Sequence, residues 1–133
     1  MALTKVESSL PEVLERLVQK TIGCCLAVHR ELGPGLNEAV YARACQLELS
    51  HAGLQCEREK AVAVRYRGTL LCHQRIDVLV ERQLILEIKS VERIIPVHVA
   101  QTVSYLRITG ARVGLLVNFN VSLLKDGIRR VIL

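Results

Sequence analysis

The sequence of 133 residues has the length of one domain, and its 50% hydrophobic residues suffice for a buried core. No apolar run approaches the roughly 20 residues of a membrane span, and the first ten residues lack the layout of a secretory signal, so we expect a cytoplasmic protein with no membrane partner. The net charge of +5 favours a polyanionic partner, whereas 3% aromatic residues and no Trp argue against a surface that stacks single-stranded bases.

The cysteines are odd in number and contain no C-x-x-C pair. They therefore indicate neither a disulfide framework nor a zinc ribbon. We interpret them as small buried hydrophobic residues in a reducing compartment. They are Cys24, Cys25, Cys45, Cys56 and Cys72.

The first half of the chain predicts two helices. Residues 1–9 are polar and are expected to fray. Apolar residues recur at three- and four-residue steps from Leu10 to Leu32, which predicts a helix with Ser9 as its cap and Pro11 in its first turn. Gly33-Pro34-Gly35 breaks this helix.

A second helix is expected over residues 37–51, with Asn37 as its cap and Gly53 as its stop. Glu38 and Tyr41 are three residues apart and are expected to share a face. From spacing alone, Glu38 is interpreted as an ordinary acid in the first turn of the helix, where its charge interacts favourably with the helix dipole. The core contacts of this region are expected from Val40, Ala44, Leu47 and Leu54.

From Gln55 the pattern changes to β structure. Three antiparallel strands are expected over 57–66, 70–80 and 84–89, with a turn at Arg67-Gly68. A helix follows over 96–109, with Gly110 just past its end and a core face of Val99, Val103, Leu106 and Ile108. Residues 112–119 form a continuous apolar run, which is typical of a strand covered on both faces and parallel to a neighbour. A short strand over 128–133 completes the order ααβββαββ, within a single domain of residues 1–133.

The most informative stretch runs from Arg75 to Ser90. Two sets of apolar residues alternate with their neighbours at a period of two, which predicts two strands. Ile76, Val78 and Val80 alternate with Arg75, Asp77 and Leu79, and Leu84, Leu86 and Ile88 alternate with Ile85, Glu87 and Lys89. If residues 81–83 form a three-residue loop, Val80 lies opposite Leu84, and counting back places Asp77 opposite Glu87. Lys89 follows on the face of Glu87.

A buried carboxylate must be paired, hydrogen-bonded or coordinated to a metal. A hard ion such as Mg²⁺ is typically held by one or two carboxylates together with water and substrate phosphate. A cross-strand salt bridge of Asp77, Glu87 and Lys89 on a solvated face is the alternative, and it is favoured if this pattern stands alone. Gln101 and Tyr105 occupy one helix face, which projects toward the Glu87 strand or toward water.

The assembled motifs resemble the GxxExxY proteins, a branch of the PD-(D/E)xK nuclease superfamily. Gly35-Leu36-Asn37-Glu38-Ala39-Val40-Tyr41 matches the motif that names the family, and Asp77 with Glu87-Ile88-Lys89 matches the nuclease core. The segments Val97–Gln101, Tyr105-Leu106, Asn118–Asn120 and Lys125–Arg130 are also similar to that family. The likeness extends from about Leu14 to Leu133.

The resemblance implies a restriction-endonuclease-like αβββαβ core with an extra N-terminal helix and a mixed central sheet flanked by helices. It implies Mg²⁺ or Mn²⁺ held by Asp77, Glu87 and Glu38, and metal-assisted phosphodiester hydrolysis. Lys89 and Gln101 complete the expected catalytic set, with Tyr41 and Tyr105 in support. The chain departs from the superfamily pattern in having Ile76 where the named Pro would precede Asp77.

The expected function is that of a metal-dependent nuclease that acts on nucleic acid, with DNA favoured over RNA. A homodimer and a protein partner that delivers substrate are left open. The competing hypotheses are a non-catalytic module that binds nucleic acid or protein, and a structural domain whose acids only pair with Lys89. The candidates for contacts to the nucleic-acid backbone are Arg43, Arg75, Arg93 and Arg107.

Overall fold

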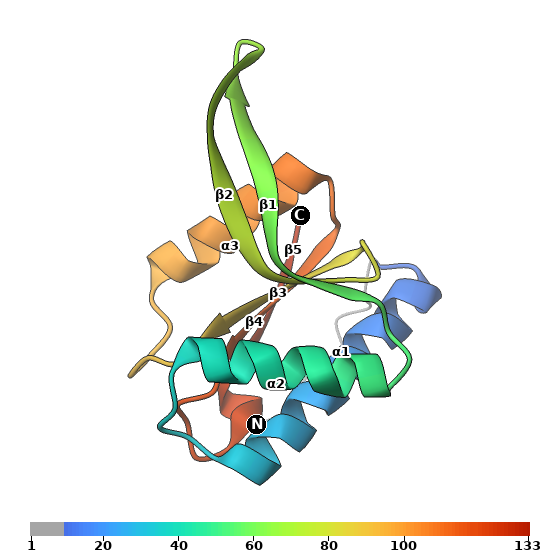
Figure 1. Ribbon diagram of the computed structural model, residues 1–133, viewed down its shortest axis with the longest axis vertical. Coiled ribbons are helices and arrows are strands. Elements are labelled where there is room, and N and C mark those ends of the chain that lie inside the picture. The colour runs from blue at the N-terminus through green and yellow to red at the C-terminus, as the bar shows by residue number, and fades with distance from the viewer. Residues whose placement is uncertain (1–9) are drawn as a thin grey trace.

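The computed structural model describes residues 10–133, which form a five-stranded mixed sheet with helices on both faces (Figure 1). The strands lie in the order β1 (Cys56–Tyr66), β2 (Thr69–Val80), β3 (Leu84–Lys89), β4 (Val113–Asn118) and β5 (Ile128–Ile132). The helices are α1 (Glu12–Leu32), α2 (Glu38–His51), α3 (Pro96–Thr109) and the short 3₁₀ helix η1 (Leu124–Gly127). Only β3 and β4 are parallel neighbours, and the predicted order of elements is confirmed.

Two buried clusters place the helices on opposite faces of the sheet. Side chains of α1 and α2 pack with Leu84, Leu86 and Ile88 of β3 in the larger cluster. Tyr105 of α3 packs with Ile85 in the smaller one. Successive β3 residues therefore point to opposite faces, as a strand requires. Every residue of β4 is buried, as its apolar run predicts for a strand covered on both sides.

Local capping explains where the helices begin and end. The Asn37 side chain accepts a hydrogen bond from the Val40 N–H at 3.2 Å, and Gly110 ends α3 in the left-handed conformation with φ of 76°. Both were predicted. Pro11 lies just before α1 rather than in its first turn, because its extended backbone only supplies the carbonyl that accepts from the Glu15 N–H at 2.9 Å. The predicted cap, Ser9, lies outside the described residues.

Several side chains that were predicted in the core are exposed. Val13, which belongs to the apolar stripe expected for the first helix, is 70% exposed, and Val40 and Leu47 are 41% and 55% exposed. The buried residues of α2 are Tyr41, Cys45 and Leu49. They recur every four residues and therefore form a single row along the helix, which is a narrower buried face than the sequence predicted. Residues next to that row face outward. In α3, likewise, Tyr105 and Leu106 are buried, whereas Ile108 lies outside the buried face of the helix and is exposed.

The β1–β2 hairpin extends well beyond the short segment of β2 that pairs with β3. β1 pairs with β2 from Cys56↔Val80 to Tyr66↔Thr69, whereas β2 pairs with β3 only from Val80↔Leu84 to Val78↔Leu86. Beyond that point the hairpin projects from the body of the molecule (Figure 1). We call residues 58–75 the arm. Every β2 residue from 69 to 75 is exposed.

All cysteines are free thiols. Cys24, Cys25 and Cys45 are buried as predicted, but Cys56 is half-buried and Cys72 is exposed because it lies on the arm. In the described part of the chain, no helix has the length and apolar character that crossing a membrane requires.

Candidate carboxylate site

Asp77 and Glu87 lie at the fork where β2 separates from β3. The turn after β2 is closed by a hydrogen bond from the Gln83 N–H to the Val80 carbonyl at 3.0 Å, and Val80 pairs with Leu84. The predicted register is therefore confirmed. Asp77 Oδ2 accepts from the Ile88 N–H at 2.8 Å, and Glu87 Oε1 accepts from the Asp77 N–H at 3.2 Å. The two carboxylates thus satisfy backbone groups that no strand partner reaches at the fork.

The electrostatics of this pair is unfavourable to two negative charges. Glu87 is only 3% exposed, and burial together with the charge of Asp77 raises the pKa of Glu87 to about 8. Burial also raises the pKa of Asp77, although the Ile88 hydrogen bond and the charge of Lys89 oppose that rise. Among the described residues neither acid forms an ion pair with a basic side chain. The alternative in which the acids only pair with Lys89 is therefore not supported by an ion pair in the described residues, although the charge of Lys89 opposes the rise in the pKa of both acids.

Glu38 reaches the same region from the first residue of α2. Its Oε1 accepts from the Ser90 N–H at 3.4 Å, and the Ser90 hydroxyl donates to the Leu36 carbonyl at 2.6 Å. These contacts tie the start of α2 to the end of β3. Glu38 and Asp77 both line a cavity of about 220 Å³, so the structure brings the predicted acids together. The lining residues are Glu38, Ala39, Ala42, Arg58, Glu59 and Asp77.

α3 presents Gln101 and Tyr105 toward the carboxylates. Tyr105 is buried, and burial followed by the charges of Glu87 and Asp77 raises the pKa of its hydroxyl. A hydrogen bond from the Gln101 side chain opposes that rise. Of the two orientations that the sequence left open, the one toward the Glu87 strand is therefore correct, although Gln101 itself is exposed.

Tyr41 does not share the exposed face of Glu38. Its side chain is fully buried, and its ring stacks on Phe119 with centroids 4.5 Å apart. The hydroxyl donates to the Gly33 carbonyl at 2.5 Å and accepts from the Leu36 N–H at 3.1 Å. Tyr41 therefore fixes the loop that leads into Glu38 instead of contacting the cavity.

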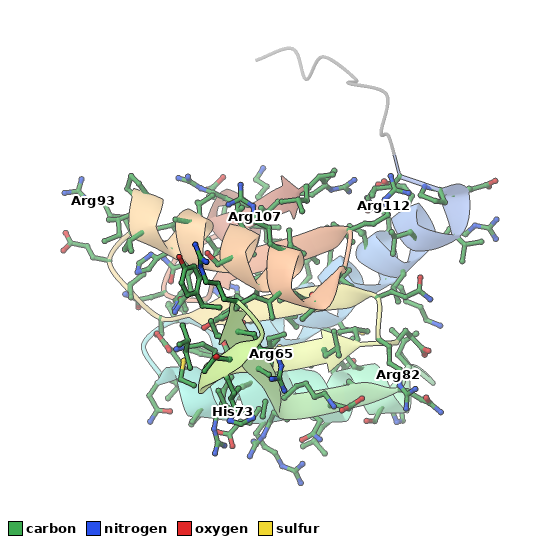
Figure 2. The ribbon with its side chains drawn as sticks, turned by 90° about the horizontal axis from the view of Figure 1, so that it is seen from above. Arg65, His73, Arg82, Arg93, Arg107 and Arg112 are labelled. Atoms are coloured by element: carbon green, nitrogen blue, oxygen red, sulfur yellow. The ribbon has the colours of Figure 1, made fainter. Side chains whose placement is uncertain are left out.

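The four arginines predicted to contact a nucleic-acid backbone do not form one surface. Arg43 is on α2 and Arg107 is on α3, which cover opposite faces of the sheet. Arg93 follows β3 and lies at a separate place from Arg107 (Figure 2). Arg75 is on the arm, where it pairs with Glu59 at 3.6 Å. Spacing along the sequence does not show which helix covers which face of the sheet. The sequence therefore could not predict which of these four arginines share a surface.

Two charged residues that line the cavity at Asp77 were not predicted for the site, Arg58 and Glu59. A two-residue turn at 67–68 would place Arg58 opposite Asp77, but the register shifts by one between Val64 and Arg65. The bulge brings Glu59 into line with Asp77, where Glu59 takes a left-handed φ of 53°. The turn at 67–68 could therefore have predicted that this part of β1 lies opposite Asp77. The bulge that shifts the register by one residue has no signature in the sequence.

A separate irregularity at Asp77 overturns one predicted side-chain direction. Ile76 was expected on the face of Val78, yet Ile76 packs in the α3-side cluster and Val78 in the α1–α2 cluster. Asp77 lies between them, where β2 leaves β3. Once a strand leaves its neighbour it twists more strongly, so simple alternation fails at this point.

Asn118 holds the chain just after the site. It pairs with Lys89 across the parallel strands β3 and β4. Its side chain accepts from the Val91 N–H at 3.1 Å and donates to the Val91 carbonyl at 2.9 Å. The sequence pattern includes Asn118 in the expected strand 112–119 and does not predict its contact with Val91. In the structure it fixes the exit of β3 and therefore the position of Lys89.

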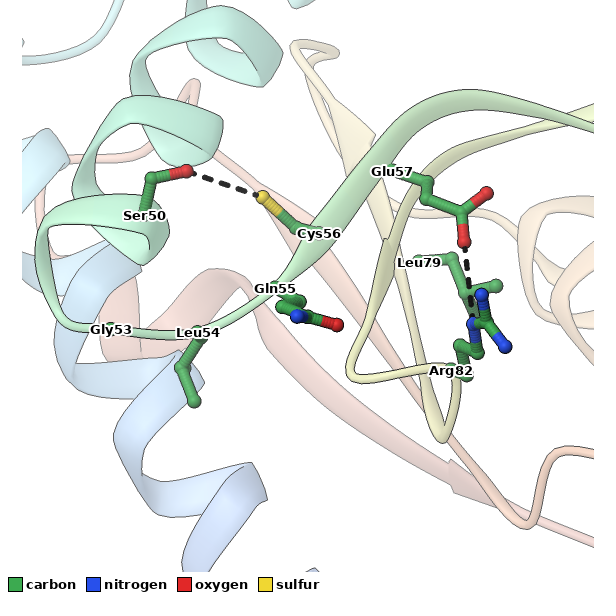
Figure 3. Close-up of a pocket in the computed structure, with 8 residues that line it drawn as sticks. All are labelled: Ser50, Gly53, Leu54, Gln55, Cys56, Glu57, Leu79 and Arg82. Atoms are coloured by element: carbon green, nitrogen blue, oxygen red, sulfur yellow. Dashed lines mark hydrogen bonds and ion pairs between the residues drawn. The ribbon is translucent and has the colours of Figure 1, made fainter.

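A larger cavity of about 600 Å³ lies between the start of β1 and the turn after β2, where Leu79 and Arg82 line it (Figure 3). Its charged lining side chains are Glu57 and Arg82, which lie 3.9 Å apart as an ion pair. This cavity has one carboxylate that is already paired and no second acid beside it. Metal-assisted hydrolysis is therefore better supported by the smaller cavity at Asp77.

Comparison with models of protein families matches residues 15–131 to the PD-(D/E)XK nuclease superfamily. The chain belongs to this superfamily. The mixed sheet flanked by helices is accordingly its restriction-endonuclease-like fold, as the resemblance implied. No curated protein and no solved structure matches the chain. The narrower assignment to the GxxExxY branch stays a prediction.

Members of the PD-(D/E)XK superfamily typically use divalent metals, and the residues at the fork fit such an ion. The described residues contain no preassembled group of three or more acidic, His or Cys side chains that could hold a metal. Asp77 and Glu87 nevertheless supply two adjacent carboxylates, one half-buried and one buried, and neither forms an ion pair among the described residues. One or two carboxylates, completed by water and substrate phosphate, are what Mg²⁺ typically takes from a protein.

Proposed function

We propose that this protein is a metal-dependent nuclease that hydrolyses phosphodiester bonds, with DNA as the favoured substrate. One observation carries the proposal: Asp77 and Glu87 are held side by side at the β2–β3 fork by backbone N–H groups. A buried Glu87 beside a half-buried Asp77 raises the free energy of the metal-free protein when both are charged, so their arrangement is best explained by a cation. Membership of a nuclease superfamily supports the same function.

The roles follow from position. Asp77 and Glu87 would hold Mg²⁺ or Mn²⁺, and Glu38 would contribute from across the cavity. When bound, the ion supplies a polarised phosphoryl oxygen and a water of lowered pKa. Lys89 stabilises negative charge that develops on the phosphate. Gln101, exposed on α3, contacts the scissile phosphate, and Tyr105 supports Gln101 from beneath.

The test is cleavage of end-labelled duplex, single-stranded and flap DNA, and of RNA, with Mg²⁺ or Mn²⁺. We expect Asp77→Ala and Glu87→Gln each to lose more activity than the roughly 10- to 100-fold that loss of an outer-shell partner typically costs. Glu92→Gln is the matched control, because Glu92 is an exposed acid in the loop after β3. Undiminished cleavage by Asp77→Ala would contradict the proposal.

The alternative is a non-catalytic module that binds nucleic acid or protein and keeps the fold. The absence of a preassembled group of three metal-binding side chains among the described residues favours it. The two functions differ in their response to metal. A nuclease site predicts that millimolar Mn²⁺ raises the unfolding midpoint and that Asp77→Ala abolishes the rise. A binding module predicts no rise, and a DNA affinity that Asp77→Ala leaves unchanged.

A further inference from the structure

The arm carries most of the excess charge of the chain. Residues 58–75 contain five basic side chains and one acidic side chain, a net charge of +4 out of +5 for the whole protein. The basic residues are Arg58, Lys60, Arg65, Arg67 and Arg75. The acid, Glu59, forms a long ion pair with Arg75 in which both side chains are more than 60% exposed. Such a pair contributes little to stability and leaves Arg75 available to another anion.

The strand register sorts the arm into two faces. Ala61 pairs with Arg75, Ala63 with His73 and Arg65 with Leu70. Because alternate residues share a face, Arg65, His73 and Arg75 lie on one side with small alanines between them. On the other side Val62 packs against the α3-side cluster. The alanine face is therefore turned away from α3. Figure 2, which looks down the arm, shows Arg65 and His73 on it.

The alanine face leads directly to the carboxylates. Asp77 follows Arg75 on β2, and Arg58 and Glu59 at the base of the arm line the cavity that contains Asp77. At roughly 3.3 Å per residue, His73 lies about 13 Å along the strand from Asp77, and the position of Leu70, opposite Arg65, lies about 23 Å away. That length is about two-thirds of the roughly 34 Å of one duplex turn.

We propose that the arm binds the phosphate backbone of duplex nucleic acid through Arg65, His73 and Arg75, and so directs the duplex toward Asp77 and Glu87. This inference rests on the proposed nuclease function, because it takes the scissile phosphate to lie at the fork. A two-stranded ribbon is one of the elements that fit the major groove, and small side chains between the cations permit close approach to the backbone.

A second copy of the chain is the competing occupant. Tyr66, Leu70 and Leu71 are exposed near the tip, and the edge of β2 beyond its pairing with β3 is free within the described residues. Pairing of two arms would cover these groups. It would also bring two charges of +4 together, which is unfavourable. Charge complementarity therefore favours the polyanion.

The test measures binding separately from cleavage. The full chain is titrated, in EDTA, against a fluorescein-labelled DNA duplex of about 30 base pairs, roughly three turns, and anisotropy is followed at several KCl concentrations. The arm variant is Arg65→Ala/Arg75→Ala. The control is Arg16→Ala/Arg30→Ala on α1, which removes the same charge at a site distant from the arm (Figure 1). Arg16 matches Arg75 because it too forms an exposed ion pair, with Glu12.

We expect the arm variant to bind roughly tenfold more weakly and to lose nearly two units from the slope of log affinity against log salt. The control variant should keep its slope. An unchanged slope in the arm variant, an equal loss in the control, or no duplex binding by the unmodified protein overturns the inference. So does a change in oligomeric state of the arm variant by sedimentation, which would identify the arm as an interface between copies.

The two proposals fail in distinguishable ways. If the arm variant binds normally while Asp77→Ala fails to cleave, the arm inference is wrong and the nuclease function stands. If the arm variant loses affinity but no substrate is cleaved by the unmodified protein, the arm binds nucleic acid and the nuclease function is wrong.

Discussion

At the scale of single residues, Gly114 shows how tightly α3 lies against the sheet. It is in the buried strand β4, and a Cβ added there would lie 2.8 Å from Thr102 Cγ2, which is closer than carbon atoms normally approach. Thr102 is itself buried, and its hydroxyl donates to the His98 carbonyl at 3.1 Å. Glycine at this position is therefore required by packing and not by backbone conformation.

We predict that Gly114→Ala destabilises the protein by about 1–3 kcal/mol, the usual cost of overpacking a buried site. Adding Thr102→Ser should recover much of the loss, because serine removes the clashing methyl group and keeps the hydroxyl. Gly23→Ala is a control of opposite sign, since nothing lies within 4 Å of its added Cβ in α1. It should stabilise by about 0.5–1 kcal/mol. Urea unfolding measures all of these variants, and a harmless Gly114→Ala would contradict the packing.

Tyr41 offers a second prediction at this scale. Tyr41→Phe keeps the stack on Phe119 but removes the hydroxyl that bridges Gly33 and Leu36. Because the Gly33 carbonyl and the Leu36 N–H each lose a hydrogen bond worth about 0.5–1.5 kcal/mol, we expect a loss of about 1–3 kcal/mol in the free energy of unfolding. The same substitution at Tyr66, which is 61% exposed on the arm, should change stability by less than about 0.5 kcal/mol. If the two variants unfold alike, the bridge contributes nothing.

At the scale of elements, the signals that worked were local. Asn37 and Gly110 were predicted because a cap depends on one residue and the turn beside it. The position of Asp77 beside Glu87 was predicted because a short loop at 81–83 leaves few registers open. In the structure Glu81 and Arg82 both have positive φ, which matches the twist of the flanking strands although neither is Gly or Asn.

The features that could not be predicted depend on contacts between distant elements. The side of the sheet that Ile76 occupies depends on where β2 leaves β3. The exposure of Val40 depends on how α2 tilts against α1, and the contact of Asn118 with Val91 depends on a parallel pair that closes only in the folded protein. Apolar periodicity contains none of this information. The candidate acids were thus predictable, whereas the residues that position them were not.

At the scale of the whole molecule, the buried side chain of Glu87 makes stability depend on pH. The pKa of Glu87 is raised by burial and by Asp77 from its ordinary 4.5 to about 8 in the folded protein. The folded state therefore binds more protons than the unfolded state between those pH values, and the free energy of unfolding falls as pH rises. Below about 4.5 and above about 8, Glu87 no longer contributes a slope.

We predict that the metal-free protein loses stability between pH 5 and pH 8 and that Glu87→Gln largely removes this loss. Urea unfolding at a series of pH values, in EDTA, gives the comparison. Glu92→Gln, an exposed acid, should follow the unmodified protein. A Glu87→Gln variant with the same pH dependence as the unmodified protein would mean that Glu87 is not held in a buried, protonated state.

The projection of the arm also makes one thiol chemically distinct. Cys72 is exposed on β2, whereas Cys24, Cys25 and Cys45 are buried and Cys56 is only half-buried. A maleimide dye should therefore react first at Cys72 in the natural sequence, without an engineered attachment point. The dye would sit on the arm, away from the core packing. A dye on Cys72 would therefore report directly on movement of the arm or on its contact with a ligand.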